Sequence, residues 1–104
     1  MSKGFNQILQ QAKKMQDRLM KLQEEMGDKT VEAQSGGGMV TCVVNGRQEV
    51  VSLKISPEVL EEKDNELLED LIMAAVNEGL NRSREMVQEE MSRVTGGMQM
   101  PFGM

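Results

Sequence analysis

The stretch FNQILQQAKKMQDRLMKLQEEM, residues 5–26, determines the first part of the fold. Its apolar residues recur at alternating intervals of three and four residues, the heptad spacing that aligns side chains along one side of a helix. Gly27 follows, a residue type that can adopt the left-handed conformation in which many helices end. We therefore predict a long helix with a narrow apolar stripe, made of Phe5, Ile8, Ala12, Met15, Leu19, Leu22 and Met26.

After this helix, residues 30–55 are rich in β-branched residues and interrupted by turn residues. The run Gly36-Gly37-Gly38 indicates a turn, and Asn45-Gly46 is typical of a two-residue hairpin turn. Apolar residues alternate with polar ones in the last of these segments, as expected of a strand with one wet face. We predict an antiparallel meander of three strands, Thr30–Ser35, Met39–Asn45 and Arg47–Ile55.

The last part of the chain is predicted to be helical. Ser56-Pro57 has the residue types of a helix N-cap and first turn, so a short helix through about Glu62 is expected. A second long periodic segment covers Asn65–Val94, and Gly79 within it indicates a close packing contact. The predicted fold class is α+β: a single domain, residues 1–94, followed by a flexible tail rich in Gly and Met, residues 95–104.

Two features of this predicted fold favour a homodimer. Helices of about 22 and 30 residues would be about 33 and 45 Å long, whereas a compact domain of this size has a radius of gyration of about 13 Å. The middle strand is also apolar on both faces, so a helix or a partner chain must cover its second side. Pairing of the two helices within one protomer would account for part of the stripe. The expected interface residues are Met39, Val43, Leu19 and Leu22.

The composition excludes several classes of function. The 104 residues include no His, Tyr or Trp, two Phe and a single Cys, Cys42. Catalysis, a metal site and a cofactor are therefore not expected, and neither is a platform that stacks unpaired bases. Cys42 is interpreted as a small buried hydrophobe. No apolar run is long enough for a membrane span or a signal peptide, so we expect a cytoplasmic protein without membrane contact.

The charge is distributed unevenly along the chain, whose net charge is −5. Residues 1–26 contain five basic and three acidic residues, and residues 57–94 contain four basic and eleven acidic ones. On the first helix, Lys14, Arg18 and Lys21 lie at i, i+4 and i+7, so they share a face that could lie along phosphates. Alternatively, this is an ordinary solvated face whose local partners are Asp17, Glu24 and Glu25.

The arginines of the last helix are interpreted differently. Arg82 has acidic residues within one turn, and so does Arg93, so both are expected to form surface ion pairs. Arg84 has less obvious partners, which makes it the better candidate for a contact with another molecule.

Several segments, in this order, resemble the YbaB/EbfC family of bacterial nucleoid-associated proteins over about 95 of the 104 residues. The matching pieces are QAKKMQDR (residues 11–18), QEE (23–25), GGGMV (36–40), VNG (44–46), LKISP (53–57), LLEDLI (67–72), AAVNE (74–78) and the ending GMQMP (97–101).

The resemblance implies an α+β homodimer that binds double-stranded DNA with little sequence preference, has no enzymatic site and acts in the nucleoid. It also implies partners among recombination or replication proteins. The family's DNA contacts carry over by position to Arg18 and Lys21, and Lys13 and Lys14 lie nearby where many members have Gln. Without the resemblance, the residues favour a helical adaptor whose apolar stripes bind a protein partner, with no nucleic acid involved.

Overall fold

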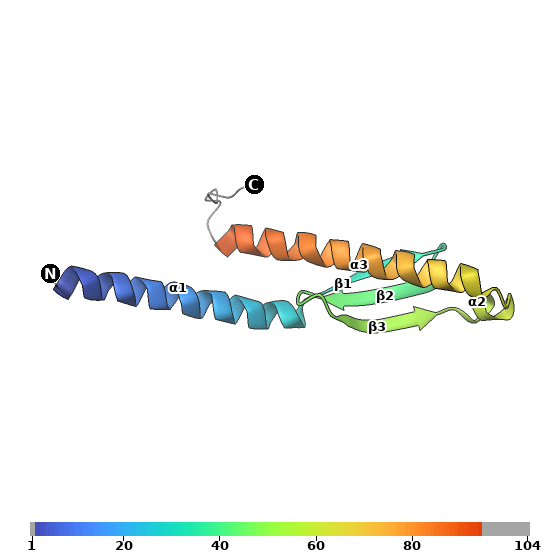
Figure 1. The fold of residues 1–104 in the computed structure, drawn as a ribbon, viewed down its shortest axis with the longest axis horizontal. Helices are drawn as coiled ribbons and strands as arrows, with labels where there is room; N and C mark the ends of the chain where they lie inside the picture. Colours follow the sequence, from blue (N-terminus) through green and yellow to red (C-terminus); the bar gives the residue numbers. More distant parts are fainter. Residues whose placement is uncertain (1, 95–104) are drawn as a thin grey trace.

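The computed structural model describes residues 2–94 and contains the predicted elements in the predicted order (Figure 1). The α+β fold class is thereby confirmed. The expected tail, residues 95–104, lies outside the described residues. The elements are α1 (Ser2–Asp28), β1 (Thr30–Ser35), β2 (Val40–Asn45), β3 (Val50–Ile55), α2 (Pro57–Glu61) and α3 (Asn65–Val94).

The molecule is elongated, with principal extents of 73 × 24 × 17 Å and a radius of gyration of 20.0 Å. One end of the sheet is continuous with α1, which runs away from it, while α3 crosses the sheet and continues alongside the C-terminal part of α1 (Figure 1). As expected from their lengths, the two long helices are not folded into a compact body. The first half of α1 extends beyond the end of α3.

The core lies between α3 and two strands of the antiparallel sheet, whose order is β1-β2-β3. Val40, Cys42 and Val44 of β2 are fully buried and pack with Ala75 of α3. On the outer face of β2, Val43 is only half-buried. The helix α3 therefore covers the side of the middle strand that carries Val40, Cys42 and Val44. Cover of the second side, by a helix or by a partner chain, stays a prediction. Burial also raises the pKa of the Cys42 thiol, in keeping with its interpretation as a core residue.

Gly79 explains how α3 comes so close to the sheet. It is buried, and a Cβ placed on it would lie 2.8 Å from Cγ2 of Val44. The close packing contact expected at Gly79 is confirmed, and the element that the glycine faces is the strand β2. Ser83, one turn further on, is fully buried and donates a hydrogen bond of 2.6 Å to the carbonyl oxygen of Asn45.

The turn between β2 and β3 differs from the predicted two-residue turn. The N–H of Asn45 donates to the carbonyl oxygen of Glu49 at 2.9 Å, so the loop has three residues, Gly46, Arg47 and Gln48. The left-handed residue is Gln48, with φ 66°. The physical reason is the Asn45 side chain, because its Oδ1 accepts from the N–H groups of Arg47 and Glu49 and fixes Asn45 at the loop entrance.

The three-residue loop shifts the start of β3 from Arg47 to Val50. A register irregularity follows, because Val44 pairs with Val50 and Val43 with Ser52, which leaves Val51 as an extra residue. The regular alternation predicted for Val51 is therefore wrong.

The helix ends follow the sequence closely. Ser56 caps α2, since its Oγ accepts from the N–H of Glu58 at 3.3 Å, as predicted. The prediction for the end of α1 is wrong in detail: the helix continues to Asp28, and Gly27 lies within it. A Cβ at Gly27 would lie 2.8 Å from Nε of Arg47, near the end of an exposed side chain that can move aside.

Candidate nucleic-acid interface

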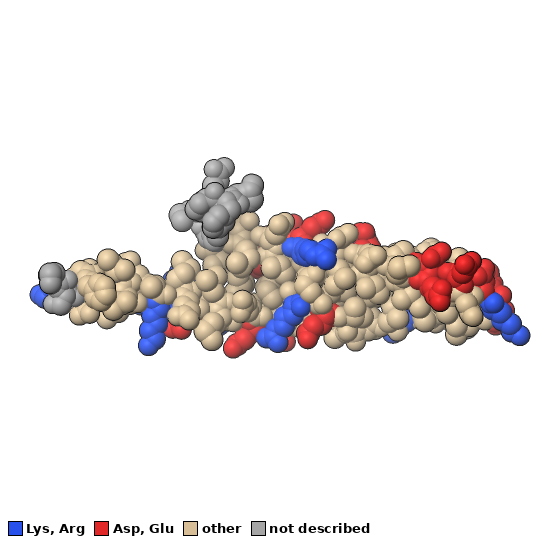
Figure 2. Space-filling view, in the orientation of Figure 1, with Lys and Arg blue, Asp and Glu red and all other residues tan. Residues whose placement is uncertain are grey.

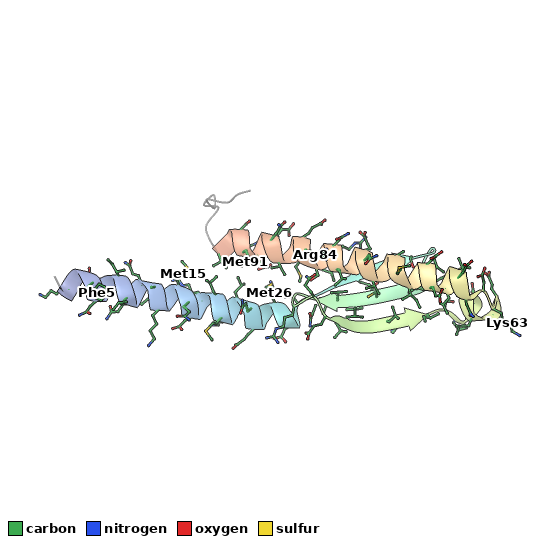
Figure 3. The ribbon with its side chains drawn as sticks, in the orientation of Figure 1. Phe5, Met15, Met26, Lys63, Arg84 and Met91 are labelled. Atoms are coloured by element: carbon green, nitrogen blue, oxygen red, sulfur yellow. The ribbon has the colours of Figure 1, made fainter. Side chains whose placement is uncertain are left out.

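The N-terminal part of α1 projects from the body as an arm, defined here as residues 2–17. Val94, the last residue of α3, lines a shallow hollow of about 190 Å³ together with Arg18, Lys21, Leu22 and Glu25. The helix α3 therefore ends beside Arg18. Phe5 lies near the free end of the arm, far beyond this point (Figure 3).

The basic face, defined as Lys14, Arg18 and Lys21, is exposed along its whole length. Within residues 2–94, ion pairs join Lys29 and Arg93 to Glu90, and Arg82 to Glu78. None of the three side chains of the basic face is therefore in an ion pair. The alternative interpretation, with Asp17, Glu24 and Glu25 as local partners, is not realised as ion pairs. The face spans about 10 Å from Lys14 to Lys21 at 1.5 Å per residue.

Two further lysines lie on the same helix. Lys13 is exposed but is one residue out of step with the basic face. Lys3 was not among the predicted site residues, although the sequence shows its position. Eleven residues make just over three turns of helix, so Lys3 lies on the same side of α1 as Lys14. It is exposed and extends the line of cations to about 27 Å, measured from Lys3 to Lys21.

The arginines of α3 divide as predicted. Nε of Arg82 lies 3.2 Å from Oε1 of Glu78, and Nη1 of Arg93 lies 3.2 Å from Oε1 of Glu90. Nη1 of Arg84 donates to the amide oxygen of Asn81 at 2.6 Å, and no carboxylate among the described residues neutralises its charge. Because Arg84 belongs to α3, the structure does not place it on the basic face of α1 (Figure 3).

The position of α1 is fixed at its C-terminal end. Leu22 and Met26 are buried, and they border a groove of about 650 Å³ whose other wall includes Val87 and Met91 of α3. The N–H of Gly46 donates to the carbonyl oxygen of Met26 at 2.9 Å. The sheet turn therefore supports the end of the helix that carries the basic face.

An ion pair adds to this attachment. Nζ of Lys29, just after α1, lies 2.9 Å from Oε1 of Glu90 on α3. The hydrogen bond from Lys29 is the main reason that the pKa of Glu90 lies below its ordinary value, and the nearby charges of Lys29 and Arg93 act in the same direction.

Acidic residues gather at the opposite end of the molecule, over α2 and the start of α3 (Figure 2). Among the described residues, no three His, Cys, Asp or Glu side chains are grouped so that they could hold a metal ion. This acidic tip would repel a polyanion. Its exposed members are Glu58, Glu61, Glu62, Asp64, Glu66, Glu69 and Asp70.

The four expected interface residues lie in different places. Leu22 is buried within the protomer, whereas Leu19 is 36% exposed at the border of the arm. Met39 is half-buried just before β2, and Val43 is half-buried on the outer face of β2. An uncovered apolar surface of the body lies on β3. The helix α3 covers β1 and β2 only, so Val50 remains 47% and Leu53 41% exposed. The predicted third strand, with one apolar and one wet face, already indicated an apolar surface on this segment.

Comparisons with known proteins agree on one family. The profile of the YbaB/EbfC DNA-binding family matches residues 1–98. A nucleoid-associated protein of Syntrophobacter fumaroxidans is 54% identical over 97% of this chain and 91% of its own. One of Thermoanaerobacter pseudethanolicus is 50% identical over 94% and 88%. The crystal structure of an uncharacterized protein from Helicobacter pylori matches with a TM-score of 0.77 and 30% identity, over 88% of this chain and 96% of that one. No helix within residues 2–94 has the length and apolarity to cross a membrane.

Proposed function

Since this chain belongs to the YbaB/EbfC DNA-binding family, we propose that it is a nucleoid-associated protein that binds double-stranded DNA with little sequence preference through the basic face of α1. Its place of action is then the nucleoid, within the cytoplasm, where recombination or replication proteins are available as neighbours. The names of its relatives support this assignment.

The observation that carries the proposal is the absence of ion pairs on the basic face within the described chain. A cation that already contacts a carboxylate must lose that contact to bind a phosphate, whereas Lys14, Arg18 and Lys21 have no such contact to lose. Their line runs along a helix that projects from the body, so a duplex can approach it without meeting the sheet. Contacts of this kind are made to the phosphate backbone and do not distinguish base sequences.

The acidic body restricts this binding to one geometry. With a net charge of −5, the whole chain is repelled by DNA at long range, and salt shortens the range of that repulsion to about 10 Å at 0.1 M. The acidic tip lies at the other end of a 73 Å molecule, well beyond this range from the arm. Binding should therefore be weak at physiological salt and directed to the basic face of α1.

The proposal includes a homodimer that presents two basic faces. Val50, Leu53 and half-buried Ile55 leave an apolar side of β3 that α3 does not cover, and this exposed surface favours contact with a second copy. Contact there leaves the arms of both copies free. Val43, one of the expected interface residues, lies on the opposite face of the sheet, because it pairs with Ser52 whereas Leu53 pairs with buried Cys42, and Met39 just precedes β2. Sedimentation at micromolar concentration should give twice the 11.6 kDa mass of the chain, and a folded monomer would contradict the dimer.

The test of the DNA site is a charge reversal. The variant Arg18→Glu, Lys21→Glu should bind a labelled duplex of about 25 base pairs at least about tenfold more weakly than the wild type at moderate salt, measured by fluorescence anisotropy. Both positions lie outside the apolar stripe, so the fold should persist. The matched control is Lys54→Glu, Lys63→Glu, which changes the net charge equally at exposed positions away from α1.

Equal losses in the two variants would show that total charge, and not the basic face, governs binding. If the wild type fails to bind duplex DNA even at low salt, the DNA proposal is wrong and the adaptor function replaces it.

A further inference from the structure

The apolar stripe of α1 is covered along only part of its length. Its C-terminal members Leu22 and Met26 are 7% and 4% exposed, because α3 and the sheet turn pack on them. The N-terminal members have no cover within the described chain: Phe5 is 63%, Ile8 64% and Met15 47% exposed. We call Phe5, Ile8, Ala12 and Met15 the arm stripe.

Contact between the β3 surfaces of two copies does not cover the arm stripe. Phe5 is separated from the end of α1 at Asp28 by about 35 Å of helix, at 1.5 Å per residue. The arm lies at one end of the molecule and β3 lies in the other half (Figure 1). The chain therefore has two separate uncovered apolar surfaces.

The side chains that flank the arm stripe suit contact with an identical stripe. With Phe5 at heptad position a, the flanking e and g positions are almost free of charge. Arms paired in this way bring few like charges together. Lys14 and Lys21 stay clear of the contact because they fall at position c, and Arg18, at position g, lies beyond Met15 at the edge of the contact. The flanking residues are Gly4, Leu9, Gln11, Gln16 and, at the border, Arg18.

We infer that the arm stripe binds the arm stripe of another copy, in an antiparallel helix pair that joins two dimers. The antiparallel direction is favoured because it keeps the acidic bodies at opposite ends of the pair. Since the basic faces remain free, the joined dimers can hold two duplexes at once; this last step rests on the proposed DNA binding.

The contact is small, since Phe5 to Met15 spans about 15 Å of helix. It should therefore be weak between free dimers and become effective when DNA holds many dimers close together, because tethering raises their effective concentration. The exposed side chain of Leu9, 52% accessible next to the stripe, widens the apolar surface.

The experiment uses the full chain and the variant Phe5→Gln, Ile8→Gln. Glutamine is neutral and a good helix former, so neither the charge of the arm nor its helix should change. The matched control is Met73→Gln, which alters an equally exposed apolar residue (57%) on α3. In sedimentation velocity without DNA, the average mass of the wild type and the control should rise above that of a dimer as concentration increases, and that of the arm variant should not.

A second readout uses one duplex on beads and a second, labelled duplex in solution. The wild type and the control should retain the labelled duplex, and the arm variant should retain at least about tenfold less, while its affinity for a single duplex stays within about twofold of wild type. If the wild type, the control and the arm variant all fail to bind a single duplex, the DNA proposal is wrong. The sedimentation experiment without DNA then tests the arm contact by itself.

Three results would overturn the inference. A wild type that remains a dimer at every concentration has no arm contact. An arm variant that becomes a monomer shows that the stripe is the dimer interface itself. If the variant Met98→Gln, Phe102→Gln associates and the wild type does not, the chain's own last residues occupy the stripe.

Discussion

Gly46 lies directly against the backbone of Met26. Its N–H donates to the Met26 carbonyl oxygen at 2.9 Å, and a Cβ at Gly46 would lie 2.5 Å from that same oxygen. The β2–β3 turn and the end of α1 are thus in contact with no room for a side chain between them. This contact fixes the direction in which the arm leaves the body.

The substitution Gly46→Ala tests this relationship. The added methyl group meets backbone, which cannot move aside as a side chain end can, so the free energy of unfolding should fall by about 1–3 kcal/mol. For a domain of this size this corresponds to a fall in the melting temperature of at least about 4 °C, measured by circular dichroism. An unchanged melting temperature would mean that the turn and the helix end are not in contact.

Gly79→Ala tests the contact between α3 and the sheet. Alanine favours a helix by about 1 kcal/mol over glycine, but its Cβ would lie 2.8 Å from Cγ2 of buried Val44, and this overpacking should outweigh the gain. We expect net destabilisation of about 1–2 kcal/mol in urea unfolding. The control is Gly4→Ala in α1, where nothing lies within 4 Å of the new Cβ, and it should stabilise slightly or have no effect. Stabilisation by both changes would contradict the close contact.

The ion pair between Lys29 and Glu90 should give a pH-dependent stability. The pKa of Glu90 is lowered in the folded protein, chiefly by the hydrogen bond from Lys29, so the pair stabilises the fold above the ordinary glutamate pKa, and this stabilisation is lost as the pH falls through the lowered value. Lys29→Gln should therefore be less stable than wild type at about pH 7, and the difference should shrink as the pH falls below the ordinary glutamate pKa of about 4.3. A difference that does not change with pH would exclude this explanation.

Cys42 provides a probe of the core. The side chain is fully buried and its pKa is raised, so both access and thiolate formation are limited. A maleimide should label the native protein at least about tenfold more slowly than the protein in urea. Rapid labelling without denaturant would show that α3 does not cover the strand as described.

The sequence predicted the elements well because each has a local signal. The stripe from Phe5 to Met26 identifies α1, and Ser56-Pro57 identifies the start of α2. The details that failed depend on side chains: Asn45 uses its Oδ1 to shape a three-residue loop, which the residue pair Asn45-Gly46 does not reveal.

The candidate site was predictable in part. Spacing placed Lys14, Arg18 and Lys21 on one face, but their freedom from ion pairs depends on rotamers and not on spacing. The contact between Met26 and Gly46, and the ion pair from Lys29 to Glu90, join residues that are distant in sequence, so no local pattern indicates them. The uncovered side of β3 likewise depends on which strands α3 crosses.

The central claim is that phosphate contacts from the basic faces of a dimer carry DNA binding. The most direct test measures the affinity of the wild type for two unrelated duplexes over a series of salt concentrations. If roughly four to six of the six cations in two basic faces contact phosphates, log affinity against log salt should have a slope of about −3.6 to −5.4 for both duplexes. A slope near zero, or binding to only one of the two sequences, would contradict the account.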